Sequence, residues 1–183
     1  MKNLPEAAQL AIFLAMACVA AGVFGMIHNQ VSYTIGPDYF HRYKFIQFNV
    51  IETFPPRLAA LIIGWKASWW MGLIIGVPLF TFALLARDKA DYASLCFKAF
   101  VTVLVTILLV DSATIIAAFA VLTPENLPPR FTGPGDWDHL GFARAGLLHD
   151  ASYLGAILGL LLAALRMVIQ IRRARRIQPQ ANP

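Results

Sequence analysis

Charged residues are scarce in this chain, and long stretches of it contain none. Of its 183 residues only 14% are Asp, Glu, Lys or Arg, whereas 58% are hydrophobic. A soluble domain usually carries about 25% charged residues, because its surface faces water. The composition therefore excludes an ordinary soluble domain and predicts a protein that is solvated by a lipid bilayer.

Cysteine is also scarce, and recognisable catalytic motifs are absent. The two cysteines, Cys18 and Cys96, lie in different apolar runs, where different depths in the bilayer would keep them apart. Their spacing fits neither a zinc motif nor a redox motif. The chain also has no HExxH sequence, no glycine-rich phosphate loop and no serine elbow. The sequence therefore indicates no particular reaction.

The net charge of +5 is the next feature that bears on function. Nucleic-acid binding would require the basic residues to line one face. They gather instead at the ends of apolar runs, most clearly at Arg172, Arg173, Arg175 and Arg176. This distribution is typical of membrane orientation, so no nucleic-acid partner is expected.

Four apolar runs are long enough to cross a membrane as helices. A hydrocarbon core of about 30 Å needs about 20 helical residues. The predicted spans cover residues 5–27, 67–86, 94–122 and 146–171. We therefore predict an all-α fold, a four-helix transmembrane bundle that forms one domain over residues 1–183. Two ordered outer segments, 28–66 and 123–145, and a cytoplasmic tail, 172–183, complete it.

The second apolar run is too long for a single crossing, since it extends from Arg57 to Ala86. Tryptophans beside a lysine mark the membrane surface, and such a group divides the run: Trp65, Lys66, Trp69 and Trp70. Residues 57–66 either continue the helix or lie in the interface, and the sequence does not decide between these. Pro78 is expected to bend the span.

Positive residues near span ends resist translocation, so they predict orientation. Placing both termini on one side collects most of them there: Lys2, Arg87, Lys89, Lys98, Arg166 and the terminal arginines. That side is predicted to be the cytoplasmic one. The two outer segments, on the opposite face, then carry acidic and basic residues in near balance.

Small residues at four-residue spacing predict where helices approach closely in a membrane. One such row lies in the second span (Ser68, Gly72 and Gly76) and another in the fourth (Ala151, Gly155 and Gly159). We expect these two spans to pack together, within one bundle or between protomers.

Polar residues of the outer half form the candidate site. All four histidines fall there: His28, His41, His139 and His149. Asp111 is the acid within the third span, and Asp150 follows His149. His28, Asp111, His149 and Asp150 are expected to converge, where they would bind a metal or haem through His28 and His149, relay protons, or hold a polar head group. Alternatively, the histidines are interfacial hydrogen-bonding side chains, and Ser112 and Thr114 satisfy Asp111.

The first outer segment combines a turn with many aromatic residues. Gly36-Pro37 predicts a turn, and the alternation of Val31, Tyr33 and Ile35 predicts a short strand before it. Asp38 is expected to cap a helix that begins at Tyr39. That helix would lie at the head groups or under the second outer segment, whose stretch 136–139 (Asp-Trp-Asp-His) offers further polar groups.

Three stretches resemble segments of uncharacterised bacterial integral membrane proteins. They read SYTIGPDYF at residues 32–40 with KFIQF at 44–48, GWKASWWMG at 64–72, and HDASYLG at 149–155. The resemblance implies a multi-pass protein of a bacterial inner membrane. It implies no activity, ligand or catalytic residue.

Three functions remain open on the sequence. The first is a non-catalytic accessory or assembly subunit that binds lipid, partner helices or a second copy of itself. The alternative is an outward-facing metal or haem redox module that uses His28 and His149. The second alternative is a small membrane enzyme or transporter subunit that depends on Asp111; a non-enzymatic role is favoured, because a single intramembrane acid is little support for a translocation path.

Overall fold

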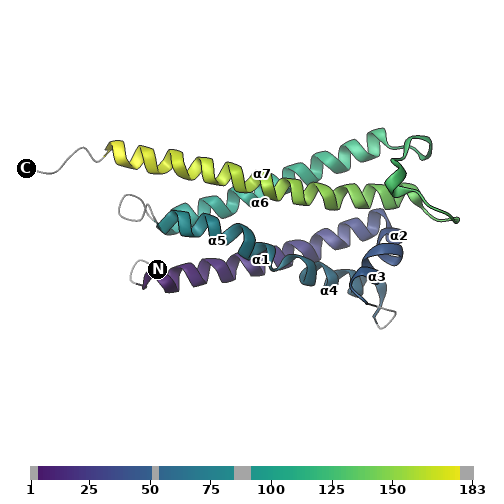
Figure 1. The fold of residues 1–183 in the computed structure, drawn as a ribbon, viewed down its shortest axis with the longest axis horizontal. Coiled ribbons are helices and arrows are strands. Elements are labelled where there is room, and N and C mark those ends of the chain that lie inside the picture. Colours follow the sequence, from purple (N-terminus) through teal and green to yellow (C-terminus); the bar gives the residue numbers. More distant parts are fainter. Residues whose placement is uncertain (1–3, 51–53, 85–91, 178–183) are drawn as a thin grey trace, which may run out of the picture.

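The computed structural model describes residues 4–50, 54–84 and 92–177 (Figure 1). Lys2, Arg87 and Lys89, which carry part of the orientation argument, lie outside these ranges. The last residues of the predicted cytoplasmic tail do so as well. Within the described ranges the chain is helical and contains no strand.

Four helices are long and apolar enough to cross a membrane: Glu6–Ile35, Pro56–Leu84, Tyr92–Val121 and His139–Arg173. The prediction of an all-α, multi-pass membrane bundle is confirmed. At about 1.5 Å per residue, a helix of 30 residues such as α1 is about 45 Å long, so it extends beyond a hydrocarbon core of about 30 Å.

Helix α1 (Glu6–Ile35) continues well past the predicted end of the first span. The predicted strand around Val31 and Ile35 is therefore wrong. The helix continues because Asn29 and Ser32, three residues apart, bury one face of it. It ends at Gly36, whose N–H donates to the Ser32 carbonyl at 2.9 Å.

The predicted helix after Gly36 exists, but it begins earlier than expected. It consists of α2 (Pro37–Tyr39), the π-helical turn η1 (Phe40–Lys44) and α3 (Phe45–Gln47). Pro37 occupies the first turn, where its missing N–H costs nothing. Asp38 lies inside the helix and does not cap it, because its Oδ2 accepts a hydrogen bond from the Asp138 N–H at 2.9 Å.

The second span is a broken helix. Helix α4 (Pro56–Ser68) and helix α5 (Met71–Leu84) are separated by a turn at Trp69 and Trp70. Residues 57–66 thus belong to α4, which is part of the same candidate span. Helix α4 packs along α1. Pro78 lies inside α5.

The helices form two pairs. Helix α1 packs along α4 and α5, and helix α6 (Tyr92–Val121) packs along α7 (His139–Ile177) (Figure 1). Gly25 of α1 lies against the backbone of Gly64 of α4, so closely that a Cβ on either residue would collide with the other helix. This close approach is typical of helix packing in membranes.

The small residues of the second and fourth spans serve different interfaces within the chain. Gly72 lies against the backbone of Ala17 in α1, and Gly76 lies against Leu14 of the same helix. Gly155 lies against Ile107 of α6, and Gly159 lies against Val103. The predicted pairing of spans two and four is therefore wrong within the monomer, because each row meets the other member of its own helix pair.

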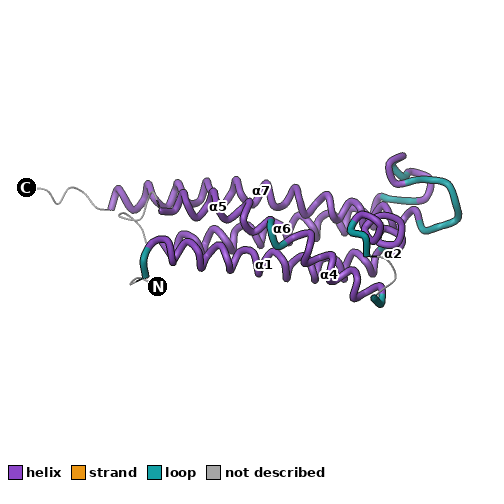
Figure 2. The backbone as a smooth tube through the Cα atoms, turned by 60° about the horizontal axis from the view of Figure 1, so that its bottom comes forward, coloured by secondary structure: helices purple, strands orange, loops and turns teal. Residues whose placement is uncertain are grey.

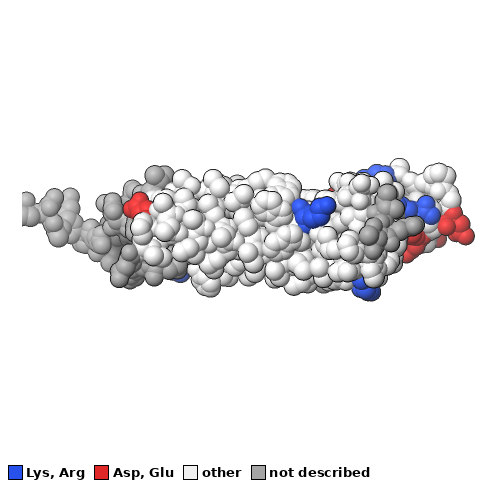
Figure 3. Space-filling view, turned by 90° about the horizontal axis from the view of Figure 1, so that it is seen from below, with Lys and Arg blue, Asp and Glu red and all other residues white. Residues whose placement is uncertain are grey.

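The start of α1 and the end of α7 lie at one end of the bundle, called here the terminal end (Figure 1). The opposite end, called the connection end, carries residues 36–50 and 122–138, including the 3₁₀ turns η3 (Pro124–Asn126) and η4 (Pro129–Phe131) (Figure 2). Much of the bundle surface between the two ends is uncharged in the view of Figure 3. This surface suits contact with lipid.

Candidate functional site

A buried polar cluster connects the two helix pairs near the connection end. The Nδ1 atom of His28 in α1 lies 3.3 Å from the Oδ2 atom of Asp111 in α6. Both side chains are buried. A carboxylate within a membrane span usually needs a partner, and His28 supplies it across the interface between the pairs. The structure therefore brings these two predicted residues together.

His149 of α7 completes the cluster. Its ring packs edge-on against the His28 ring, with 4.8 Å between the ring centroids. Its Nε2 atom lies 3.2 Å from the Oδ1 atom of Asn29. Asn29 in turn donates from Nδ2 to the carbonyl oxygen of Ala60 in α4 at 2.9 Å. Four helices, α1, α4, α6 and α7, thus meet through polar side chains.

The hydrogen-bonding partners of His149 are both acceptors. Nδ1 lies 2.9 Å from the Ala145 carbonyl oxygen, and the Asn29 oxygen faces Nε2 because the Asn29 amide nitrogen is already used. A neutral imidazole has one N–H and satisfies one of these acceptors, whereas an imidazolium satisfies both. The neutral ring therefore keeps one nitrogen without a hydrogen atom.

The described residues do not assemble a metal site of three donors. Among them no group of three His, Cys, Asp or Glu side chains is placed to hold a metal ion. His28 and His149 each face an acceptor through Nδ1, Asp111 and the Ala145 carbonyl respectively. Their two Nε2 atoms are fewer donors than the three protein ligands that a stable zinc site uses.

Two polar atoms of the cluster have no hydrogen-bond partner in the described part of the chain. They are Nε2 of His28 and Oδ1 of Asp111, and both are buried. Buried polar groups in native proteins are normally satisfied, so such atoms point to an additional ligand. When Nδ1–H of His28 donates to Asp111, Nε2 is an acceptor, and no described residue donates a hydrogen bond to it.

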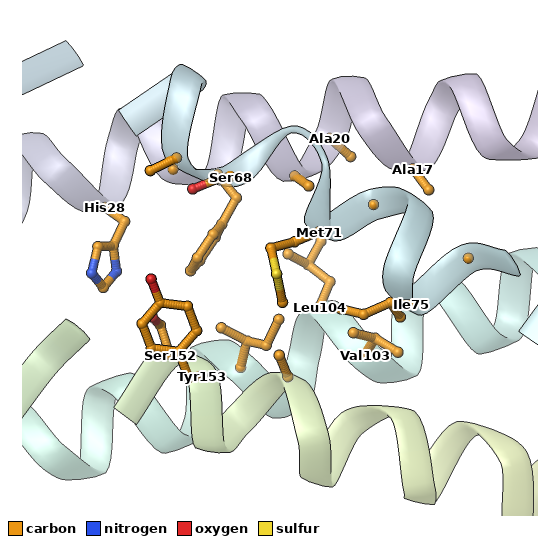
Figure 4. Close-up of a pocket in the computed structure, with 18 of the residues that line it drawn as sticks. Ala17, Ala20, His28, Ser68, Met71, Ile75, Val103, Leu104, Ser152 and Tyr153 are labelled. Carbon is orange, nitrogen blue, oxygen red and sulfur yellow. The ribbon is translucent and has the colours of Figure 1, made fainter. Parts of the chain in front are cut away.

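His28 lines a cavity between the helix pairs (Figure 4). The cavity has a volume of about 130 Å³ and follows α1 from His28 to Ala17, a distance of about 16 Å at helical rise. Its polar lining is at the His28 end: His28, Asn29, Lys44, His149, Ser152 and Tyr153. Toward Ala17 the lining is apolar: Met71, Ile75, Leu79, Phe80, Val103 and Ile107.

The break between α4 and α5 shapes this cavity. Figure 4 shows the non-helical turn beside it, with Ser68 before the turn and Met71 after it. Gly72, one residue further, lets α5 rejoin α1 closely. The interruption of the second span therefore places short and flexible side chains around the cavity.

A second cavity, of about 430 Å³, adjoins the first at His28. It is lined by Asp111 and Ser112 of α6, by Leu148 of α7 and by apolar residues of α1 and α6, and it shares Ala20, Phe24, His28 and Leu104 with the first. The His28–Asp111 pair thus forms part of the wall between two spaces.

Lys44 is the buried cation of the site. It comes from the connection end, is 6% exposed and lines the first cavity. Its Nζ atom lies 3.4 Å from Oε1 of Gln47, and no carboxylate of the described residues lies within ion-pair distance of it. Burial lowers the pKa of Lys44 below its ordinary value of 10.5, and the more distant Asp150 only partly offsets this.

Aromatic residues close the site at the connection end. The ring of Tyr39 packs 4.7 Å from the His149 ring and 5.2 Å from that of Phe142, measured between centroids. Phe40 is completely buried and lies 6.0 Å from His149. Burial raises the pKa of the Tyr39 hydroxyl, so it stays protonated at neutral pH. These rings exclude water from the His149 side.

The remaining predicted polar residues lie outside the cluster. Asp150 is exposed and pairs with Arg130, whose Nη2 lies 2.7 Å from its Oδ2, so its expected place in the site is wrong. His41 contacts the hydroxyl of Tyr33 at 3.1 Å. His139 stacks on Trp137, with 3.7 Å between centroids, and Arg42 lies over that same tryptophan. The two connection segments therefore pack on each other, as one of the sequence hypotheses required.

We compared the chain with protein-family models, curated proteins and solved structures. Nothing matches. The stretches 32–48, 64–72 and 149–155 meet in this structure, since each contributes to the wall of the first cavity: Lys44 from the first, Ser68 from the second, and His149 and Tyr153 from the third. The function must be argued from this site.

Sequence reasoning missed Asn29, Lys44, Ser152 and Tyr153 as site residues. The prediction that residues 28–35 leave the membrane concealed Asn29, which shares a buried helical face with Ser32 and His28. Lys44 was expected in a segment that lies at the head groups or under the second outer segment, so it was not considered as part of the cluster. If the first helix had been predicted to continue to Ile35, Asn29 would have been placed inside the bundle.

Proposed function

We propose that this multi-pass membrane protein is a non-catalytic protein that binds an amphiphilic membrane lipid, with the apolar chain in the first cavity and the polar head at His28, Lys44 and His149. The observation that carries this proposal is the cavity itself, which is apolar along α1 and ends at a buried, incompletely satisfied polar cluster. Ligand sites typically combine an apolar lining with a few convergent polar groups.

The size and position of the cavity support a chain-like ligand. An apolar cavity of about 150 Å³ is large enough for benzene, and this cavity of about 130 Å³ is of the same order. It therefore accommodates a head group and the first part of one chain, while the rest of the chain stays among the lipids. The gap between the two helix pairs is the route by which the ligand reaches the cavity.

Catalysis has less support. Ser152, the hydroxyl nearest in sequence to His149, donates its hydrogen to the His149 carbonyl at 2.8 Å. Thus Ser152 is committed to its own helix backbone and does not form a nucleophile–base pair with His28. Asp111 has no second acid in the cluster with which to relay a cation.

We further propose that the protein resides in a bacterial cytoplasmic membrane with both termini in the cytoplasm, and that it serves as an accessory subunit. The positive residues near the terminal end support this orientation: Lys98 and Arg166, with Arg172 and Arg173 beyond them. The common location of both termini follows from an even number of spans.

The test is lipid analysis of the purified protein. Ala20 lines both cavities, so Ala20→Phe fills the space without altering the polar cluster. Ala117, on an exposed face of α6, provides the matched control Ala117→Phe. We expect mass spectrometry to detect a stoichiometric lipid in the wild type and in Ala117→Phe, and to find it depleted in Ala20→Phe. Equal lipid content in both variants would contradict the proposal.

A further inference from the structure

We propose that the lipid bound in the first cavity is an acid: a single-chain amphiphile whose anionic head, a carboxylate or a phosphate, lies between Lys44 and His28. This inference rests on the proposed function and specifies its ligand. It follows from the charges and hydrogen-bonding capacities of the groups at the polar end of the cavity.

Lys44 places a positive charge at this end of the cavity. It is the lysine that the described structure buries, and its Nζ atom lies 3.4 Å from the Gln47 amide oxygen. The rings of Tyr39, Tyr43 and Phe48 also face this atom, at 5.8, 5.4 and 5.9 Å from their centroids, and they attract the cation without neutralising it. The neighbouring acid Asp150 is directed to Arg130 at 2.7 Å, and Asp111 is directed to His28. A buried cation without a counter-ion is costly, and an anionic ligand removes that cost.

The unpartnered Nε2 atom of His28 faces the same end of the cavity. Asp111 holds Nδ1 at 3.3 Å and thereby orients the ring, with the other nitrogen buried and without a partner among the described residues. An acid satisfies this atom in either protonation state: its O–H donates to a neutral ring, or its anion accepts from a protonated one.

A neutral head group satisfies only half of the site. An alcohol donates to Nε2 of His28 but leaves the charge of Lys44 without compensation, and an ester offers acceptors but no charge. The other polar residues of the wall contribute no carboxylate: Asn29, Ser68, His149, Ser152 and Tyr153. The anionic head is therefore the chemistry that the wall favours.

Oleate and methyl oleate test the inference, because they share a chain and differ in the charge of the head. Binding of each to the full-length protein in detergent is measured at equilibrium at neutral pH. We expect the wild type to bind oleate about tenfold or more tightly than methyl oleate, the range expected of a close buried charge pair. This comparison needs no variant and is independent of any folding defect.

Variants then assign the preference to Lys44. Lys44→Met should abolish the oleate preference, and Lys44→Arg should retain much of it. Lys66→Met is the matched control, because Lys66 of α4 is exposed and does not line the cavity. An unchanged oleate preference in Lys44→Met, or its loss in Lys66→Met, would overturn the assignment.

The other outcomes separate this inference from the proposed function. If the two ligands bind equally and Ala20→Phe weakens both, the cavity binds lipid but not an acid, and only this inference fails. If neither ligand binds and Ala20→Phe leaves the lipid content of the purified protein unchanged, the proposed function fails together with this inference. Inorganic phosphate is the last probe. If it binds as tightly as oleate and its binding depends on Lys44, the site binds free anions, and the assignment of an amphiphilic ligand is overturned.

Discussion

His28 and Asp111 lie 3.3 Å apart, from Nδ1 to Oδ2, on two helices, α1 and α6, that otherwise have few contacts with each other. The pair therefore joins the two halves of the bundle where apolar packing is sparse. A few side chains at such contacts determine how the two helix pairs fit together.

Removing Asp111 is expected to destabilise the protein through His28. Asp111→Leu leaves the buried Nδ1 of His28 without its partner, which costs about 1–3 kcal/mol. The double variant with His28→Leu should lose less than the sum of the two single changes, because neither polar group then remains buried. Thermal unfolding in detergent measures this, and Asp150→Asn, in an exposed ion pair, is the control with a small effect. Strictly additive losses would show that the pair does not interact.

Gly72 and Gly76 of α5 form a matched pair one helical turn apart. A Cβ at Gly72 meets the backbone of Ala17 and Cys18, whereas a Cβ at Gly76 meets the side chains of Leu14 and Phe80 at 3.1 Å. Backbone cannot move aside as side chains can. Gly72→Ala should therefore lower the free energy of unfolding by about 1–3 kcal/mol and Gly76→Ala by less. The reverse order would contradict the observed packing of α1 on α5.

The stability of the wild type should rise with pH because of Lys44. Burial lowers the pKa of Lys44 in the folded protein below its ordinary value of 10.5. Between the folded and unfolded pKa values the unfolded chain binds one more proton, so the free energy of unfolding increases with pH in that window. Below the folded pKa the full cost of the buried charge persists.

Unfolding of lipid-free wild type and lipid-free Lys44→Met, followed from about pH 7 to about pH 9.5, isolates this effect, because a bound acid would neutralise Lys44. The upper limit avoids the titration of tyrosines at their ordinary pKa of 10.0. The variant should be more stable at the lower end and should lack the rise, whereas Lys66→Met should keep it. An identical pH dependence in wild type and Lys44→Met would show that Lys44 does not titrate in this range.

Cysteine labelling tests the orientation. In a background with Cys18 and Cys96 replaced, Gly133→Cys places a thiol in the connection segment, and Arg173→Cys places one near the terminal end. A membrane-impermeant maleimide added to intact cells should label the first and not the second. Arg173→Cys should react only after the membrane is permeabilised. Labelling in the opposite order would invert the proposed topology, and labelling of both in intact cells would contradict the span count.

Hydrophobic run lengths identified this as a four-span membrane protein without any tertiary information. They succeeded because each apolar run independently exceeds the bilayer thickness. The same reasoning placed His28, Asp111 and His149 in the same half of the bundle and expected them to converge, although it put His28 at the end of its span, and α1 continues to Ile35. It failed for residues 28–35 and for Asp150, because polar residues on a helix do not reveal whether they face a partner helix or water.

The sequence by itself determined the number of spans and the helical class, since these depend on local composition along single helices. The tertiary structure alone decided that α1 continues to Ile35, that α4 and α5 form one broken span, and that the small-residue rows serve α1 and α6. It also decided that Lys44 is buried beside the cavity. These features depend on which helix face meets which neighbour, and that choice arises from packing between segments distant in the chain.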